Sequence, residues 1–325
     1  MYASLRTLLP VVLFILGIAS PAAADSPKTV PVSGKNLGTI FNNDSNNIIY
    51  ALDEKTATPD GYLTVLRVLL DRKPGVLAQC VGFPDPVMYP SEVATRWDKY
   101  AVEAADLLVK DKVWPKHDTD REVALLRQLF DAGTNPLDLA IQACRERGVL
   151  FVASYRMNSE DWYHHTYRLS ELGRAHPEYR IGNSGALDPA VPEVYAHRMK
   201  IFREVASKHD IDGIELDFRR WYRMVSNPGE NHVVLTRMVR DCRKMLDEVA
   251  REKGRRKLLL GVRVGPSLDA SSSPFVFPGM EYVNNPGNAS CKDLGLDVKT
   301  WIREGQPWAL PPGYVLPRPK TTRKP

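Results

Sequence analysis

The sequence lacks the short motifs that identify several large classes of enzyme. It has no G-x-G-x-x-G segment after its first predicted strand, no phosphate-binding P-loop and no G-x-S-x-G nucleophile elbow. It also shows no repeat with the period of a solenoid. These absences argue against a dinucleotide-binding fold, a P-loop nucleotidase, an α/β-hydrolase and a repeat protein.

Long hydrophobic runs are absent beyond the first 24 residues, so no later segment is expected to span a bilayer. Those 24 residues resemble an export signal, with Arg6 as a short positive region and an almost wholly apolar stretch over 8–18. The run 22–24 is all alanine and places small residues before a cleavage site after Ala24. An uncleaved anchor is the alternative, but the stretch is short and Pro10 interrupts it. The sequence therefore predicts a secreted or periplasmic protein.

Cysteine is scarce, with Cys80, Cys144, Cys242 and Cys291 as the four residues of this type. Their long spacings match no metal-binding pattern, and export would allow any of three disulfide pairings. Cys80 lies in a strand-like run, whereas Cys144 and Cys242 lie in helix-like runs, which are usual places for buried free thiols. We expect free thiols, no metal site and no cofactor, with a disulfide as the alternative.

The 325 residues are 43% hydrophobic and 26% charged, which is an ordinary globular composition. The formal charge of +5 comes from Arg6 and from four basic residues among the last eight, so the rest of the chain sums to zero. We expect no nucleic-acid partner. The predicted organisation is a signal peptide (1–24), a loose segment (25–37), a folded unit (38–305) and a disordered tail rich in proline and basic residues (306–325).

Strand-like and helix-like runs alternate through the folded unit. The predicted strands are 38–41, 76–81, 149–155, 213–218 and 258–264. One predicted helix begins after Thr58, and the others cover 136–147, 190–208, 230–253 and 293–304. A long loop, with one helical piece near 92–110, runs to about residue 120. Long loops follow strands and short ones follow helices, which favours a (β/α)8 barrel over a doubly wound sheet. Only about five βα units are visible, so we expect either a linker or tail after Gly305, or a truncated barrel.

The segment 212–218 carries the most information about chemistry. Side chains alternate along a strand, so Ile214 and Leu216 share one face while Glu215 and Asp217 share the other. Two inward carboxylates at the carboxyl end of a barrel strand indicate either an active site or a structural network of ion pairs.

Neighbouring strands and the loops that follow them add polar and aromatic side chains. Ser154, Arg156 and Asn158 share one parity on the preceding strand, and Gly261 and Arg263 do so on the next. The predicted substrate-binding residues are Arg156, Asn158, Trp162, Tyr163, His164, Arg219, Trp221 and Arg263. Rings and hydrogen-bonding groups at a barrel mouth suit sugar rings, although the same rings could simply pack long loops.

The run D-G-I-E-L-D-F-R over 212–219 resembles the D-G-x-D-x-D-x-E strand of family 18 glycoside hydrolases, with Arg219 where that family has its catalytic glutamic acid. A closer resemblance is to the glycosyl hydrolase-like 10 group of barrels, through G-I-x-L-D-F over 213–218 and through 258–263 and 295–305. The resemblance implies a barrel that acts on a polysaccharide or oligosaccharide.

On this basis we predict that Glu215 is the general acid and Asp217 the second carboxylate or its orienting partner. Lesser candidates for a carboxylate role are Asp85, Glu160, Asp161 and Asp269. The alternative is a carbohydrate-binding barrel without catalysis, or an inactive fragment. The oligomeric state, the sugar and the linkage are left open by the sequence.

Overall fold

The computed structural model places most of the predicted folded unit. The described residues are 37–83, 85–99, 116–157, 170–182, 186–219, 224–265, 268–269 and 290–306. The predicted signal peptide, nearly all of the loose segment and all but the first residue of the predicted tail lie outside these ranges.

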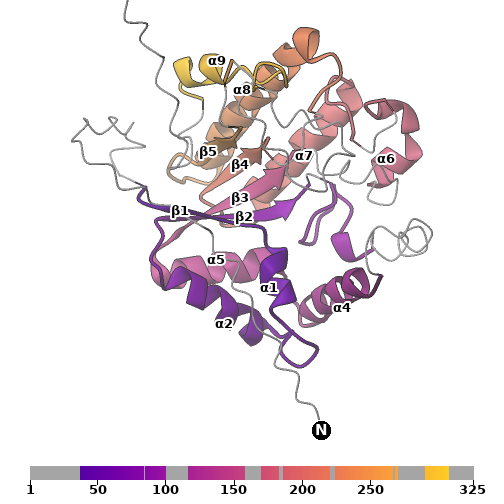
Figure 1. Cartoon of the computed structure of the whole chain (residues 1–325). Helices are drawn as coiled ribbons and strands as arrows, with labels where there is room; N and C mark the ends of the chain where they lie inside the picture. The colour runs from indigo at the N-terminus through magenta and orange to yellow at the C-terminus, as the bar shows by residue number, and fades with distance from the viewer. Residues whose placement is uncertain are drawn as a thin grey trace, which may run out of the picture.

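Five parallel strands form one sheet, as the sequence predicted (Figure 1). They are β1 Ile40–Asn43, β2 Val76–Gly82, β3 Leu150–Arg156, β4 Gly213–Asp217 and β5 Leu259–Arg263. Neighbours in the sheet are neighbours in the chain, in the order β1-β2-β3-β4-β5. A doubly wound sheet requires a reversal of strand order, which the described strands do not have.

Helices follow the strands and cover the sheet. Those that the structure describes are α1 Asn46–Tyr50, α2 Pro59–Leu70, α4 Lys116–Asp131, α5 Pro136–Arg147, α6 Glu171–Ala175, the short 3-10 helix η3 Pro177–Tyr179, α7 Pro192–Lys208, α8 Pro228–Glu252 and α9 Val298–Arg303. Helix α5 packs against β2 and β3, α7 against β4, and α8 against β5 (Figure 1). The described part of the chain is thus a mixed α/β unit, compatible with an incomplete βα barrel.

Local signals in the sequence explain where two of these helices begin and end. The Thr58 side chain accepts a hydrogen bond from the backbone N–H of Gly61, and Asn135 caps α5 by accepting from the backbone of Leu137 and Asp138. A proline opens each of these helices. Gly148 ends α5 with φ 65°, a left-handed conformation that glycine adopts without strain.

One helix was not predicted, and several predicted bounds differ from the structure, those of α7 and α9 among them. Helix α4 occupies Lys116–Asp131, where the sequence predicted a loop to about 120 and no helix before 136. Helix α7 begins at Pro192 and not at 190, since Val191 before the proline stays extended. Helix α9 begins at Val298 and not at 293, because a turn ending at Gly295 (φ 76°) precedes it.

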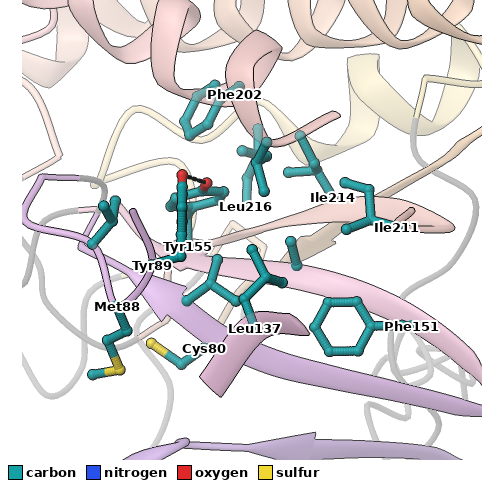
Figure 2. Packing of buried hydrophobic residues seen from close by; sticks show 14 of the residues in the cluster. Cys80, Met88, Tyr89, Leu137, Phe151, Tyr155, Phe202, Ile211, Ile214 and Leu216 are labelled. Carbon is teal, nitrogen blue, oxygen red and sulfur yellow. Dashed lines mark hydrogen bonds between the residues drawn. The ribbon is translucent and has the colours of Figure 1, made fainter. Parts of the chain in front are cut away.

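The outer face of the sheet carries the hydrophobic core. Ile214 and Leu216 are fully buried against the helices, as the alternation along β4 predicted. Tyr155 on β3 packs edge-on against Phe202 of α7, and its hydroxyl lies 2.6 Å from that of Tyr89 (Figure 2). Each residue buried in this way stabilises the fold by about 1.5–3 kcal/mol.

The inner face of the sheet changes character along the strands. At the amino ends it is apolar, where Val76, Ala78, Val152 and Leu259 form a small separate cluster. Towards the carboxyl ends it is polar. The sheet is curled, because Asn42 on β1 reaches Arg263 on β5, and these are its two outermost strands. The polar side chains of this face are thereby gathered into one place.

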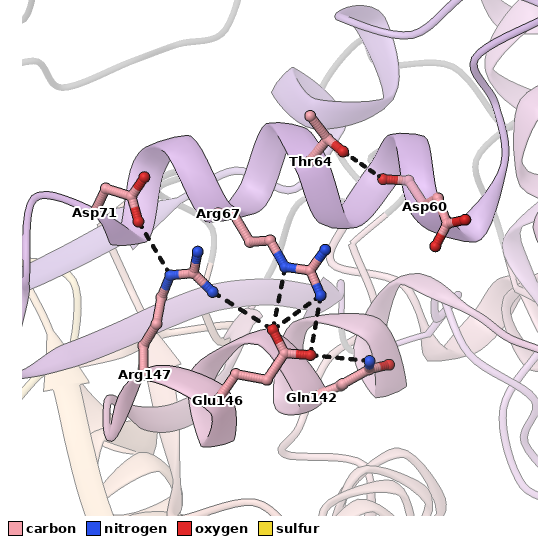
Figure 3. A network of polar contacts seen from close by, with 7 residues as sticks. All are labelled: Asp60, Thr64, Arg67, Asp71, Gln142, Glu146 and Arg147. Carbon is pink, nitrogen blue, oxygen red and sulfur yellow. Dashed lines mark hydrogen bonds and ion pairs between the residues drawn. The ribbon is translucent and has the colours of Figure 1, made fainter.

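A group of exposed ion pairs links α2 to α5 on the outside of the fold (Figure 3). Two nitrogens of Arg67, Nε and Nη2, donate hydrogen bonds to the carboxylate of Glu146. Arg147 forms ion pairs with both Glu146 and Asp71. Gln142 adds a hydrogen bond to Glu146. Exposed pairs of this kind contribute about 0–1 kcal/mol each, so this cluster adds little to stability while it links the two helices.

All four cysteines are buried and free, as predicted. Burial raises the pKa of Cys80 and Cys291 to about 11 and that of Cys144 to about 12, and it raises the pKa of Cys242 further still. The thiols therefore stay protonated and unreactive near neutral pH. Among the described residues, no helix has the length and apolar character needed to cross a membrane.

Candidate active site

Four of the predicted site residues come together at the carboxyl ends of three adjacent strands. The register pairs Arg156 with Asp217 and Asp217 with Arg263, so these three side chains occupy one level of β3, β4 and β5. Glu215 lies one level below, beside Ser154. The predicted juxtaposition of two arginines and two carboxylates is therefore present.

Glu215 is almost fully buried, with 4% of its surface exposed. Its Oε1 accepts two hydrogen bonds, from Ser154 Oγ at 2.7 Å and from Asn42 Nδ2 at 2.9 Å. No described residue donates a hydrogen bond to Oε2. One oxygen of this carboxyl group is thus held by the protein from two strands.

Asp217 has a different environment, in which both of its oxygens accept hydrogen bonds. The backbone N–H of Arg219 donates to Oδ1 at 3.0 Å, and Arg263 Nη1 donates to Oδ2 at 3.1 Å. The residue is 1% exposed. An arginine and a backbone N–H thus hold both oxygens of this buried side chain in place.

Asn42 connects the two carboxyl groups through Arg263. Arg263 Nη1 donates to Asn42 Oδ1 at 2.6 Å, while the amide nitrogen of Asn42 donates to Glu215. The contact spans the curled sheet from β5 to β1, and then from β1 to β4. These hydrogen bonds make one continuous polar cluster of Glu215, Asp217 and Arg263.

Arg156 points into the same end of the sheet and is 8% exposed. It forms an ion pair with Asp44, just after β1, with 2.6 Å between Nη2 and Oδ1. Its guanidinium carbon also lies 5.6 Å from the centre of the Phe83 ring. Asp44 is the more open partner, with 28% of its side chain exposed.

The pKa of Glu215 is raised from an ordinary value of 4.5 to about 7, chiefly because burial disfavours its charged form. The negative charge of Asp217 raises that pKa further, whereas Ser154, Arg263 and Asn42 act to lower it. The charges nearby agree with a neutral carboxyl group. Arg156 and Arg263 balance Asp44 and Asp217, so the cluster is neutral when Glu215 is protonated.

The backbone N–H of Arg219 donates a hydrogen bond to Asp217, and Arg219 itself is an exposed residue. Five predicted substrate-binding residues lie outside the described residues: Asn158, Trp162, Tyr163, His164 and Trp221.

The lesser carboxylate candidates divide in the same way. Glu160 and Asp161 lie outside the described residues. Asp85 accepts from the backbone of Thr95 and from His197, each at 2.8 Å, and Asp269 pairs with Lys299. Asp85 and Asp269 thus make their polar contacts away from Glu215.

Asn42 and Asp44 are members of the cluster that the sequence reasoning missed. A signal was present, because the polar run 42–47 follows the first predicted strand directly. The carboxyl ends of parallel strands meet at one edge of the sheet, so polar residues that follow β1 are candidates for the site just as those of β4 are.

Comparison with known proteins found no match to any family profile and none among curated proteins. Within the described ranges, no group of three or more potential metal ligands is close enough to hold an ion. Within this cluster, the group best placed to exchange a proton near neutral pH is Glu215.

Proposed function

We propose that this chain is an exported glycoside hydrolase-like protein of the (β/α)8 barrel type, which cleaves a polysaccharide or oligosaccharide with Glu215 as general acid. The observation that carries the proposal is the buried Glu215, whose pKa of about 7 leaves it protonated when most carboxyl groups are ionised. The resemblance of 212–219 to glycoside hydrolase strands supports the same assignment.

The stagger of the strands supports the barrel type. Following the register from Asn42 across the sheet leads to Leu259 on β5, yet Asn42 contacts Arg263, four residues farther along. In a barrel with eight strands the shear is about eight, which means that the register is staggered by about eight residues around the whole barrel. Residues at the same height on strands half a circumference apart therefore differ by about four positions in the register. The observed offset is the one that half of such a barrel would have.

Hydrolysis of a glycosidic bond needs a proton for the leaving oxygen and a second carboxylate as nucleophile or base. Protonated Glu215 supplies the first. Both oxygens of Asp217 are engaged, so we assign it the orienting role and not that of nucleophile or base. Its charge also favours the protonated form of Glu215.

We assign the second carboxylate to Asp44. It is held by Arg156, it is the most exposed carboxylate of the cluster, and it follows β1 at the same end of the sheet. Arg156 and Arg263 then position these carboxylates in addition to their predicted contacts with substrate. The aromatic residues predicted on the loops, and export through residues 1–24, remain predictions on which this function depends.

A carbohydrate-binding barrel without catalysis is the second candidate. The observation that favours it is the shielding of the proposed acid, since Glu215 is 4% and Asp217 1% exposed. A substrate oxygen must approach Oε2 of Glu215 for proton transfer, whereas binding at the mouth would not require this.

The test is an assay for new reducing ends with a panel of polysaccharides and the chain from Asp25 onward. We expect Glu215→Gln to lower turnover at least about 100-fold with the fold intact, because the acid is lost while shape is kept. Turnover of the unchanged protein should fall above about pH 7, where Glu215 ionises.

Glu178→Gln is the matched control, since Glu178 lies on the exposed turn η3 and contacts only its own neighbourhood. Full turnover in folded Glu215→Gln would remove the acid assignment. Binding of a polysaccharide with no release of reducing ends would favour the second candidate.

A further inference from the structure

The carboxamide of Asn42 lies between a group that only donates hydrogen bonds and a group that can either donate or accept. Its oxygen is 2.6 Å from Nη1 of Arg263 and its nitrogen is 2.9 Å from Oε1 of Glu215. A guanidinium has no acceptor atom, so the atom that faces Arg263 must be the amide oxygen. The N–H group of Asn42 is therefore committed to face Glu215.

This commitment decides which oxygen of Glu215 can carry a proton. A proton on Oε1 directed at Asn42 would meet the N–H group of Asn42, so that oxygen must offer a lone pair there. Ser154 Oγ lies 2.7 Å from the same Oε1, and among the described residues this is the hydrogen bond that its buried side chain makes. A proton on Oε1 directed at Ser154 would leave the hydroxyl hydrogen of Ser154 without an acceptor. We propose that Asn42 is a positioning residue that commits Oε1 of Glu215 to accept hydrogen bonds and places the acidic proton on Oε2. As a statement about catalysis this rests on the proposed function.

The charged and titratable groups at this end of the sheet come from β2 to β5 and from the segment after β1. They are Asp217 on β4, Arg263 on β5, Arg156 on β3, Cys80 on β2 and Asp44 after β1. Asn42 is neutral, yet its donated hydrogen bond favours the ionised form of Glu215. Its loss should therefore raise the pH at which Glu215 titrates.

The first experiment follows the carboxyl carbon of Glu215 by NMR in protein labelled with carboxyl-¹³C glutamate, with the signal assigned by its absence in Glu215→Gln. We expect Asn42→Ala to raise the titration midpoint by about 1 to 2 pH units from about 7, since a hydrogen bond to a charged group is lost. Asn43→Ala is the matched control, because Asn43 is buried next to Asn42 but bonds Gln79 on the outer face. A midpoint that Asn42→Ala leaves unchanged, or lowers, overturns the proposal.

The second experiment locates the proton with infrared difference spectra at pH 5, protein minus Glu215→Gln. If Oε1 is the carbonyl oxygen, losing the Asn42 donor must move the C=O stretch of protonated Glu215 to higher frequency. An unmoved stretch in Asn42→Ala overturns the placement on Oε2.

Asn42→Asp covers the case in which Asn42→Ala does not fold, because aspartate keeps the size of asparagine and still accepts from Arg263. Facing Glu215 with an acceptor should raise the titration midpoint by at least about 1 pH unit, and no rise would overturn the proposal. Both readouts are made without substrate. If they behave as expected while no polysaccharide is cleaved, the proposed function fails and the role of Asn42 in placing the proton stands.

Discussion

Glu215 makes the stability of the fold depend on pH in a direction opposite to that of most carboxyl groups. A salt-bridged carboxylate has a lowered pKa in the folded state and stabilises the fold above its unfolded pKa. Glu215 has a pKa raised from 4.5 to about 7, so the folded state binds its proton more tightly than the unfolded chain does. Its contribution is fully present below about pH 4.5 and is lost as the pH rises through about 7.

The size of this effect follows from the shift. A difference of about 2.5 pH units, at about 1.4 kcal/mol per unit, corresponds to about 3 kcal/mol of unfolding free energy lost between pH 4.5 and 8. Glu215→Gln removes the titrating group and keeps a neutral side chain that can accept from Ser154 and Asn42 through its oxygen. The variant should therefore be about 2.5 kcal/mol more stable, relative to the unchanged protein, at pH 8 than at pH 5.

Denaturant unfolding followed by circular dichroism at pH 5 and pH 8 measures this double difference. Glu178→Gln should change little between the two pH values, because Glu178 is exposed and its hydrogen bond with His176 lowers its pKa, away from this pH range. A double difference near zero for Glu215→Gln would mean that Glu215 is ionised in the folded protein at pH 5, and the acid assignment would be lost with it.

Two further predictions concern the contacts that hold the cluster and the cysteines. Arg263→Met should lower the free energy of unfolding by about 3 kcal/mol, because it leaves buried Asp217 without its cation. Arg240→Met, whose partner Glu304 is exposed, should lower it by less than about 1 kcal/mol. Chemical denaturation measures both changes, and equal values would contradict a buried ion pair at Asp217. A thiol reagent should label none of the four cysteines in the folded chain and all four in denaturant without reductant; fewer than four in denaturant would indicate a disulfide.

Much of the sheet could be predicted from local pattern. The parity of Glu215 and Asp217 follows from strand geometry alone, and the structure places Ile214 and Leu216 on the helix side as expected. Helix ends are equally local, so the predicted start after Thr58 and the predicted bounds 136–147 agree with α2 and α5. Helix α4 was missed although Val123, Leu126 and Leu129 are apolar residues at helical spacing, and all three are buried.

The contacts that complete the site could not be predicted in this way. Asn42 bonds Glu215 across 173 positions and Arg263 across 221 positions of the chain. Both contacts depend on the curl and stagger of the whole sheet, which no window of neighbouring residues encodes. The sequence indicates which side chains face inward, whereas the pairing among them is a property of the assembled fold.

The bond between the first and last strands has a consequence for how the protein acquires its chemistry. The entropic cost of closing a loop grows slowly with its length, but a contact between residues 221 apart forms only after the intervening elements are in place. Arg263 is synthesised after Asn42 and Asp217, so neither of these contacts of its guanidinium can form before β5 is made and paired with β4. On the role that we propose for Asn42, a chain that ends before β5 would lack the contact that orients the Asn42 amide toward Glu215.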